Sequence, residues 1–123
     1  MNPIISLVLA VGMVSVPVQT PQPTQQLAAI VYAYSSTTWQ TDASPLVTAS
    51  GEHVHDGIVA NNCLPFGTVV TLPELFGDKQ FVVQDRMAAR YGCASFDIWF
   101  SSTMAARQFG KRSTIVSLPS LFD

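Results

Sequence analysis

Residues 81–100 read FVVQDRMAARYGCASFDIWF, and the rest of the chain is organised around them. The pattern is that of a strand, a loop and a second strand. Each apolar run contains a single carboxylate, Asp85 at the end of FVVQD and Asp97 inside FDIWF. Aspartate is a poor strand residue, and burial of its charge beside aromatic rings is costly unless it is paired or takes part in chemistry. The two aspartates therefore predict the floor of an active site.

The composition limits the class of protein. The chain has 123 residues, enough for one domain with a single hydrophobic core. Only 11% of its residues are charged, and the formal net charge is −2. Such a surface does not attract a phosphate backbone, so we expect no nucleic acid partner.

An almost unbroken apolar run extends from Ile4 to Val16. Its length is typical of a signal-peptide core and is shorter than the ~20 residues that cross a bilayer as a helix. We expect residues 1–20 to be a signal peptide and the mature protein to be exported, to the periplasm, the cell wall or the exterior. Because the first three residues carry no cation and no Ala-x-Ala site follows, an uncleaved N-terminal anchor is the alternative, with membrane attachment through this segment only.

Composition also divides the remaining chain. Proline and uncharged polar residues precede the first β-rich run, so we expect residues 21–28 to form an extended linker. The folded domain is then residues 29–118, and residues 119–123 form a tail.

Short β-rich runs separated by Gly and Pro turns predict the strands. Ser101 or Ser102 can cap a helix whose apolar side contains Met104 and Phe109, with Gly110 after its end. We therefore predict a mainly β fold, a small closed barrel of six strands with one short helix. The expected strands are residues 27–34, 57–60, 68–72, 81–85, 96–100 and 113–118.

Seven segments resemble, in the same order, motifs of the 3D domain. This domain is named for three aspartates and occurs in the membrane-bound lytic transglycosylase A family and in small bacterial proteins that cleave the cell wall. The resemblance covers residues from about 30 to 118. The segments are YAYSS (32–36), TASG (48–51), GIVA (57–60), LPFGT (64–68), VQDRM (83–87), FDIWF (96–100) and FGKR (109–112).

The resemblance implies a double-ψ β-barrel that cleaves the glycan strands of peptidoglycan. The family's acid/base aspartate lies in the strand that matches FDIWF, which assigns this role to Asp97, and the preceding aspartate matches Asp85. Many members place their first aspartate just after the segment that matches GIVA, where this chain has residues 61–63, NNC. Asp42 could supply a third carboxylate only from an earlier loop. Residues 86–87 are Arg-Met here, whereas many members have Thr-Gly.

A lytic transglycosylase needs one carboxyl group that starts protonated. It gives its proton to the glycosidic oxygen and then takes the proton of the sugar's own 6-hydroxyl, so an anhydro sugar forms without attack by water. The apolar neighbours of Asp97 would raise its pKa towards this role. The alternative is that Asp97 points to solvent or pairs with one of the arginines, Arg86, Arg90 or Arg107.

Asp85 shares a strand face with Phe81 and Val83 if the period of two holds, so it should point into the core or a groove. Near Asp97 it would keep the acid protonated by repulsion between like charges, or orient a sugar hydroxyl. It could instead cap a turn or pair with Arg86. Two carboxyl groups with a water between them would make the enzyme a hydrolase.

Other side chains are candidates for substrate binding. Thr48, Asp42 and Tyr34 form this set, and the alternative for Thr48 is a hydroxyl that satisfies its own loop. Tyr34, Trp39 and Trp99 could stack on sugar rings or belong to the core.

The sequence indicates no cofactor. His53 and His55 would share one face of an extended segment, but without a third spaced ligand we expect no metal. Cys63 and Cys93 suit one disulfide in an oxidising compartment, worth roughly 3 to 4 kcal/mol for a loop of about thirty residues. A nucleophilic pair of Cys93 and His55 is excluded by such a bridge.

The expected function is therefore the cleavage of peptidoglycan glycan strands by a small exported lytic transglycosylase. Two other functions stay open at this point. One is a barrel that binds glycan without cleaving it, and the other is a structural domain that docks to a partner protein. The fold alone does not separate these three functions.

Overall fold

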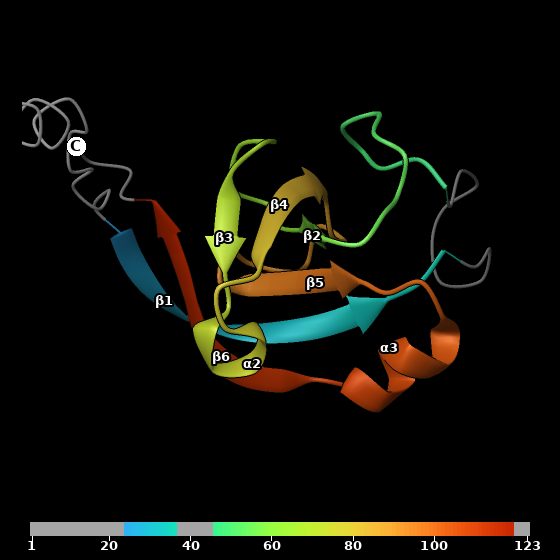
Figure 1. The fold of residues 1–123 in the computed structure, drawn as a ribbon. Coiled ribbons are helices and arrows are strands. Elements are labelled where there is room, and N and C mark those ends of the chain that lie inside the picture. Colours follow the sequence, from blue (N-terminus) through green and yellow to red (C-terminus); the bar gives the residue numbers. More distant parts are fainter. Residues whose placement is uncertain (1–23, 37–45, 120–123) are drawn as a thin grey trace, which may run out of the picture.

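The computed structural model describes residues 24–36 and 46–119 (Figure 1). Six strands close into a barrel in the order β1-β5-β2-β4-β3-β6, which confirms the predicted fold class. The strands are β1 (Thr24–Tyr34), β2 (Ile58–Ala60), β3 (Val69–Thr71), β4 (Gln80–Asp85), β5 (Ser95–Trp99) and β6 (Arg112–Pro119), and the helices are α2 (Pro73–Phe76) and α3 (Thr103–Phe109).

The barrel mixes parallel and antiparallel pairs. β1 pairs with β5 and β2 pairs with β4 in parallel, whereas the remaining neighbours are antiparallel. A parallel pair needs a long connection between its strands, so each of these pairs joins segments far apart in the sequence. The strand β5 therefore lies between β1 and β2 in the barrel, although it is the fifth strand of the chain.

Alternate residues of the strands fill the barrel. In β5, Phe96 and Ile98 are buried, whereas Ser95, Asp97 and Trp99 are only partly covered. The period of two places the first set in the interior and the second on the outer face. The core cluster has members from all six strands and comprises Ala29, Val31, Val59, Leu64, Val70, Leu72, Phe81, Val83, Phe96, Ile98, Phe109, Val116 and Leu118.

The predicted helix is confirmed as α3. Its N-cap is Ser102, whose side chain accepts a hydrogen bond from the backbone N–H of Ala105 at 3.0 Å. Gly110 follows its end with a φ of 68°, a conformation that favours glycine.

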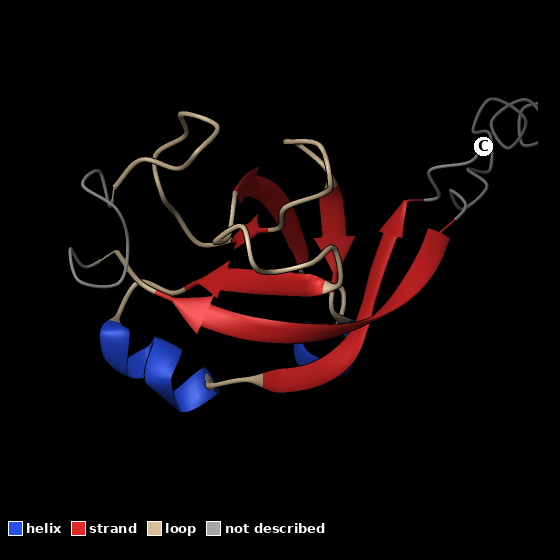
Figure 2. Cartoon of the chain, turned by 180° about the vertical axis from the view of Figure 1, so that it is seen from behind, coloured by secondary structure: helices blue, strands red, loops and turns tan. Residues whose placement is uncertain are grey.

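The second helix, α2, was not predicted. Pro73 directly follows the expected strand 68–72 and begins a short helix, because the first helical position has no need of an N–H donor. Both helices lie along the β1 and β6 side of the barrel, and the long loops lie on the other side (Figure 2). The outer faces of β5 and β2 are therefore left to the loops.

β1 begins earlier than expected, inside the stretch 21–28 that we interpreted as a linker. Thr24 to Val31 pair with Pro119 to Arg112 of β6, so backbone pairing extends through residues with little apolar character. Pairing with a distant strand has no signal in the local composition. The predicted signal peptide, residues 1–20, and all but the first residue of the predicted tail lie outside the described residues. None of the helices that the structure describes is long and apolar enough to cross a membrane.

Candidate active site

Four neighbouring strands place one residue each in a row across the outer face of the sheet. Asp97 of β5 pairs with Tyr32 of β1 on one side and with Ala60 of β2 on the other, and Ala60 pairs in turn with Asp85 of β4. Directly paired residues project from the same face. The two carboxyl groups therefore lie on one surface, and the side chain between them in the row is the methyl group of Ala60.

A β-bulge brings Asp85 to this surface. Val59 pairs with Val83, but the next residue, Ala60, pairs with Asp85, so Gln84 is an extra residue in β4. A bulge reverses the alternation beyond it and often re-aims a side chain next to an active site. The prediction that Asp85 shares a face with Val83 by the period of two is wrong for this reason. Because of the bulge, Asp85 nevertheless projects from the same face of the sheet as Asp97.

Asp85 is held by three hydrogen bonds. Its Oδ2 accepts from the hydroxyl of Tyr34 at 3.0 Å, and its Oδ1 accepts from the backbone N–H groups of Ala49 and Arg86, both at 2.9 Å. Three donors from three segments fix both the position and the orientation of this carboxylate. Tyr34, which we predicted to bind substrate, thus donates its hydroxyl hydrogen bond to Asp85 from β1.

Asp97 has a contrasting environment. Burial, and next the negative charge of Asp85, raise the pKa of the Asp97 carboxyl from 3.8 to about 7. Its Oδ1 is buried and accepts no hydrogen bond from any described residue. A buried carboxyl group with few donors favours the protonated form. Asp97 thus supplies a proton donor close to neutral pH.

Arg86 does not neutralise either carboxyl side chain. Its Nη1 donates to the carbonyl oxygens of Asn61 and Leu64 at 2.8 and 2.9 Å, and its guanidinium stacks on the ring of Phe66 at 3.9 Å. The backbone N–H of Arg86, not its side chain, contacts Asp85. The arginine is therefore a structural tie between two loops.

Asp97 opens into a pocket of about 290 Å³. The other lining residues come from β1 and from the loop between β4 and β5: Tyr32, Ala33, Tyr34, Met87 and Tyr91. Tyrosine rings offer flat apolar faces with polar edges, which suit the faces and hydroxyl groups of a sugar. The pocket combines a carboxyl group whose pKa is raised to about 7 with walls that can bind carbohydrate.

Tyr34 stays protonated beside this acid pair. Its burial, then the charge of Asp85 and the hydrogen bond to it, raise the pKa of the hydroxyl, and the charge of Asp97 adds to the effect. The hydroxyl is thus a fixed donor to Asp85 and takes no part in proton exchange.

The pocket wall that carries Met87 and Tyr91 is fastened to the turn after β2. The disulfide between Cys63 and Cys93, predicted from the sequence, is confirmed, with Cα atoms 5.2 Å apart. Asn62 donates from Nδ2 to the carbonyls of Ala88 and Tyr91 and accepts from Met87 N–H. These bonds fix the loop relative to Asp97.

Asn61 is the buried centre of the same connection. Its Nδ2 donates to the carbonyl oxygens of Cys93 and Ser95, and its Oδ1 accepts from the N–H groups of Cys63 and Leu64. All four hydrogen-bonding positions of the amide are therefore used. The sequence contains no signal for these distant carbonyl partners.

The other predicted site residues lie outside the acid pair. Thr48 Oγ1 accepts from the N–H of Glu52 and lies 3.0 Å from Ser50 Oγ, so its hydroxyl bonds within its own loop. Trp99 is on the outer face and donates to Ser36 Oγ at 2.6 Å. Asp42 and Trp39 lie outside the described residues.

The residues that could bind a metal are dispersed in the described part of the chain. His53 and His55 are exposed, and Nδ1 of His55 lies 2.8 Å from the carbonyl oxygen of Asp56. Within residues 24–36 and 46–119, no three side chains of His, Cys, Asp or Glu are grouped to hold an ion.

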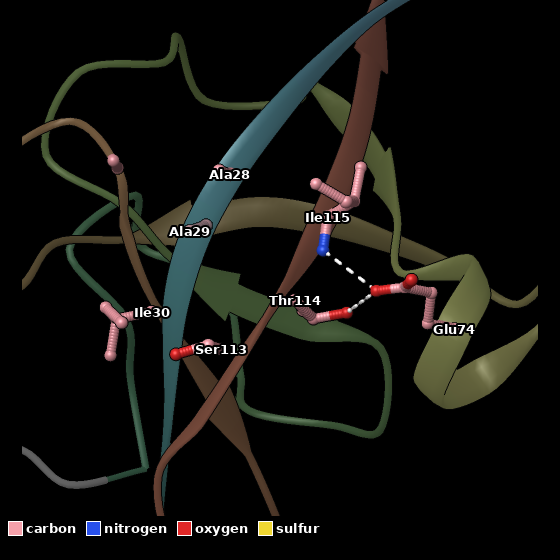
Figure 3. A pocket seen from close by; sticks show the side chains of 8 residues that line it. Ala28, Ala29, Ile30, Glu74, Ser113, Thr114 and Ile115 are labelled. Atoms are coloured by element: carbon pink, nitrogen blue, oxygen red, sulfur yellow. Dashed lines mark hydrogen bonds between the residues drawn. The ribbon is translucent and has the colours of Figure 1, made fainter.

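A second pocket, of about 400 Å³, lies between β1 and β6 (Figure 3). Its lining is mostly small or apolar, and its one carboxylate is Glu74 of α2. Oε1 of Glu74 accepts from the Thr114 hydroxyl at 2.8 Å and the Ile115 N–H at 3.3 Å. This carboxylate ties α2 to β6. Among the described residues, the pocket has no second carboxyl group, so we do not place a catalytic acid in this pocket.

Comparison with known proteins adds no relative. No family model matches the chain, and no curated protein is similar enough to it to be counted as one.

Proposed function

We propose that the protein is a small exported enzyme that cleaves the glycan strands of peptidoglycan as a lytic transglycosylase. The observation that carries the proposal is the carboxyl group of Asp97, which is buried beside a second carboxylate in a tyrosine-lined pocket. The resemblance of seven segments to the 3D domain and the closed six-stranded barrel support the same conclusion. The disulfide is compatible with export.

The proposed reaction uses Asp97 twice. The protonated carboxyl group donates to the glycosidic oxygen, the bond from this oxygen to the anomeric carbon breaks, and positive charge develops on that carbon. The carboxylate of Asp97 then accepts the proton of the sugar's 6-hydroxyl as its oxygen bonds to the anomeric carbon. The products are an anhydro sugar and a shorter strand with a free hydroxyl group. The tyrosines hold the sugar, and no metal or cofactor takes part.

The environment of Asp85 favours this route over hydrolysis. A hydrolase needs its second carboxylate as a base for water or as a nucleophile. Both oxygens of Asp85 already accept hydrogen bonds from Tyr34, Ala49 and Arg86, which lowers their reactivity. We assign Asp85 to the support of Asp97 through its negative charge, which also stabilises positive charge on the sugar.

The test is incubation with purified sacculi, followed by mass analysis of the released fragments. We expect anhydro ends, with release lost at least 100-fold in Asp97→Asn, which keeps the shape of the side chain and removes the proton donor. Asp78→Asn is the matched control, since it makes the same chemical change at an exposed turn. Reducing ends would identify a hydrolase, retention without release a glycan-binding protein, and full activity of Asp97→Asn would remove the catalytic assignment.

A further inference from the structure

Two cations stand at the rim of the pocket, each over a tyrosine ring. Lys111 Nζ lies 5.7 Å from the ring centroid of Tyr32, and the guanidinium carbon of Arg90 lies 4.7 Å from that of Tyr91. The two rings meet edge to face with centroids 5.3 Å apart, and both line the pocket. The four side chains form one continuous cluster, the cation–tyrosine rim.

Lys111 extends the row of outer-face residues. Val31 of β1 pairs with Arg112 of β6, so the antiparallel register puts Lys111 beside Tyr32. Tyr32 is in turn the direct partner of Asp97. The row thus runs from the cation Lys111 at one end, past Asp97, to Asp85 at the other, so a ligand lying along it would meet opposite charges at its two ends.

The rim cations have no carboxylate partner among the described residues, unlike Lys79, which pairs with Asp56 at 2.8 Å. Among the described residues, Arg90 contacts the ring of its neighbour Tyr91 and donates to the Tyr91 hydroxyl at 3.2 Å. Ring faces attract a cation without occupying its N–H donors. Lys111 and Arg90 therefore keep their charge and most of their donors for a ligand.

We propose that the cation–tyrosine rim is a subsite for a carboxylate borne by the glycan strand, so that the pocket selects acidic peptidoglycan over neutral glycans. The inference rests on the proposed function and names the part of the substrate that this end of the groove binds. A peptidoglycan strand carries carboxylates on its stem peptides and, where these are removed, on the lactyl groups of its sugars. Chitin oligosaccharides have the same backbone linkage and no carboxylate, so they are the neutral comparison.

Binding is measured by calorimetry on Asp97→Asn, so that no probe is cleaved. Three probes of equal sugar number are compared: chitin oligosaccharide, glycan stripped of peptides, and glycan with stem peptides. We expect the acidic probes to bind about tenfold more tightly at low salt, with the advantage reduced as ionic strength rises. The acidic probe with the larger gain in affinity over chitin oligosaccharide identifies the source of the carboxylate.

Lys111→Gln and Arg90→Gln, each added to Asp97→Asn, are expected to weaken binding of the acidic probes about fivefold and to leave the neutral probe unchanged. Lys79→Gln is the matched control, because it removes the same charge at a site already paired with Asp56. Equal affinity for neutral and acidic probes, or equal losses in Lys79→Gln and Lys111→Gln, would overturn the subsite.

The two proposals can fail separately. Cleavage of sacculi by the unmodified protein with no preference for acidic probes would refute the subsite and leave the proposed function intact. Charge-dependent binding with no cleavage would refute the proposed function and leave an acidic-glycan binding site.

Discussion

Replacing Asp97 with asparagine is expected to stabilise the fold above pH 7 while it abolishes cleavage. The carboxyl group has a pKa of about 7 in the folded protein against an ordinary value of 3.8. The folded state therefore binds more protons than the unfolded state between these values, and stability falls as the pH rises through this window. Asparagine has no charge to bury, so the variant loses this dependence.

The size of the effect follows from the same two values. At about 1.4 kcal/mol for each pH unit, the difference between the pKa values of 3.8 and about 7 sets an upper limit of about 4 kcal/mol for the cost of ionising Asp97 above pH 7. Relaxation and entry of water at the pocket mouth reduce this cost, so we expect a gain of about 2 kcal/mol at pH 8.5. At pH 4, where the folded protein already holds the proton, the gain should fall below about 1 kcal/mol.

The assay is urea unfolding followed by tryptophan fluorescence at several pH values, with the disulfide intact. Asp78→Asn, at an exposed turn, controls for the loss of one negative charge. A stability difference between Asp97→Asn and the unmodified protein that is the same at pH 4 and pH 8.5 would refute the argument. A variant that is less stable at both would show that the carboxylate is structural.

Three further predictions concern the site and its support. Cleavage of sacculi should fall as the pH rises through about 7, because Asp97 must start protonated, and a rate that keeps rising to pH 9 would contradict this. Asn61→Asp should lower the free energy of unfolding by about 2 to 4 kcal/mol, since a carboxylate cannot donate to the two carbonyls that its Nδ2 holds, and a neutral result in urea unfolding would show that water replaces those bonds. Replacing Cys63 and Cys93 together with alanine should cost about 3 to 4 kcal/mol in the same assay, with a loss under 1 kcal/mol refuting a structural role for the bridge.

The strands and the helix α3, which has capping signals, could be predicted from the sequence because both depend on short-range chemistry. The β-rich run around Asp97 and the Ser102 cap needed only their neighbours to be recognised. The start of β1 in a polar stretch could not be predicted, because its stability comes from pairing with β6, more than eighty residues later in the chain. The helix at Pro73 was missed because proline ends a strand and begins a helix with equal ease.

The residues of the site could likewise be predicted in part, whereas the contacts that position them could not. The two unusual aspartates were visible as carboxylates in apolar runs, and Cys63 and Cys93 as the one possible bridge. The route by which Asp85 reaches Asp97 was not visible, since a single extra residue in β4 decides it. The buried amide of Asn61 was missed for a related reason: its partners are backbone carbonyls, which every residue has and no sequence pattern distinguishes.

The three-residue strand β2 has a consequence for when the surroundings of Asp97 form during folding. Val59 and Ala60 each pair with both β4 and β5, so β2 is the strand that joins the strands of the two carboxyl groups. In the unfolded chain, Asp97 lacks its pocket and the neighbouring charge of Asp85, so its pKa returns to the ordinary value of 3.8. The raised pKa of Asp97 is therefore a property of the assembled barrel and not of any isolated segment.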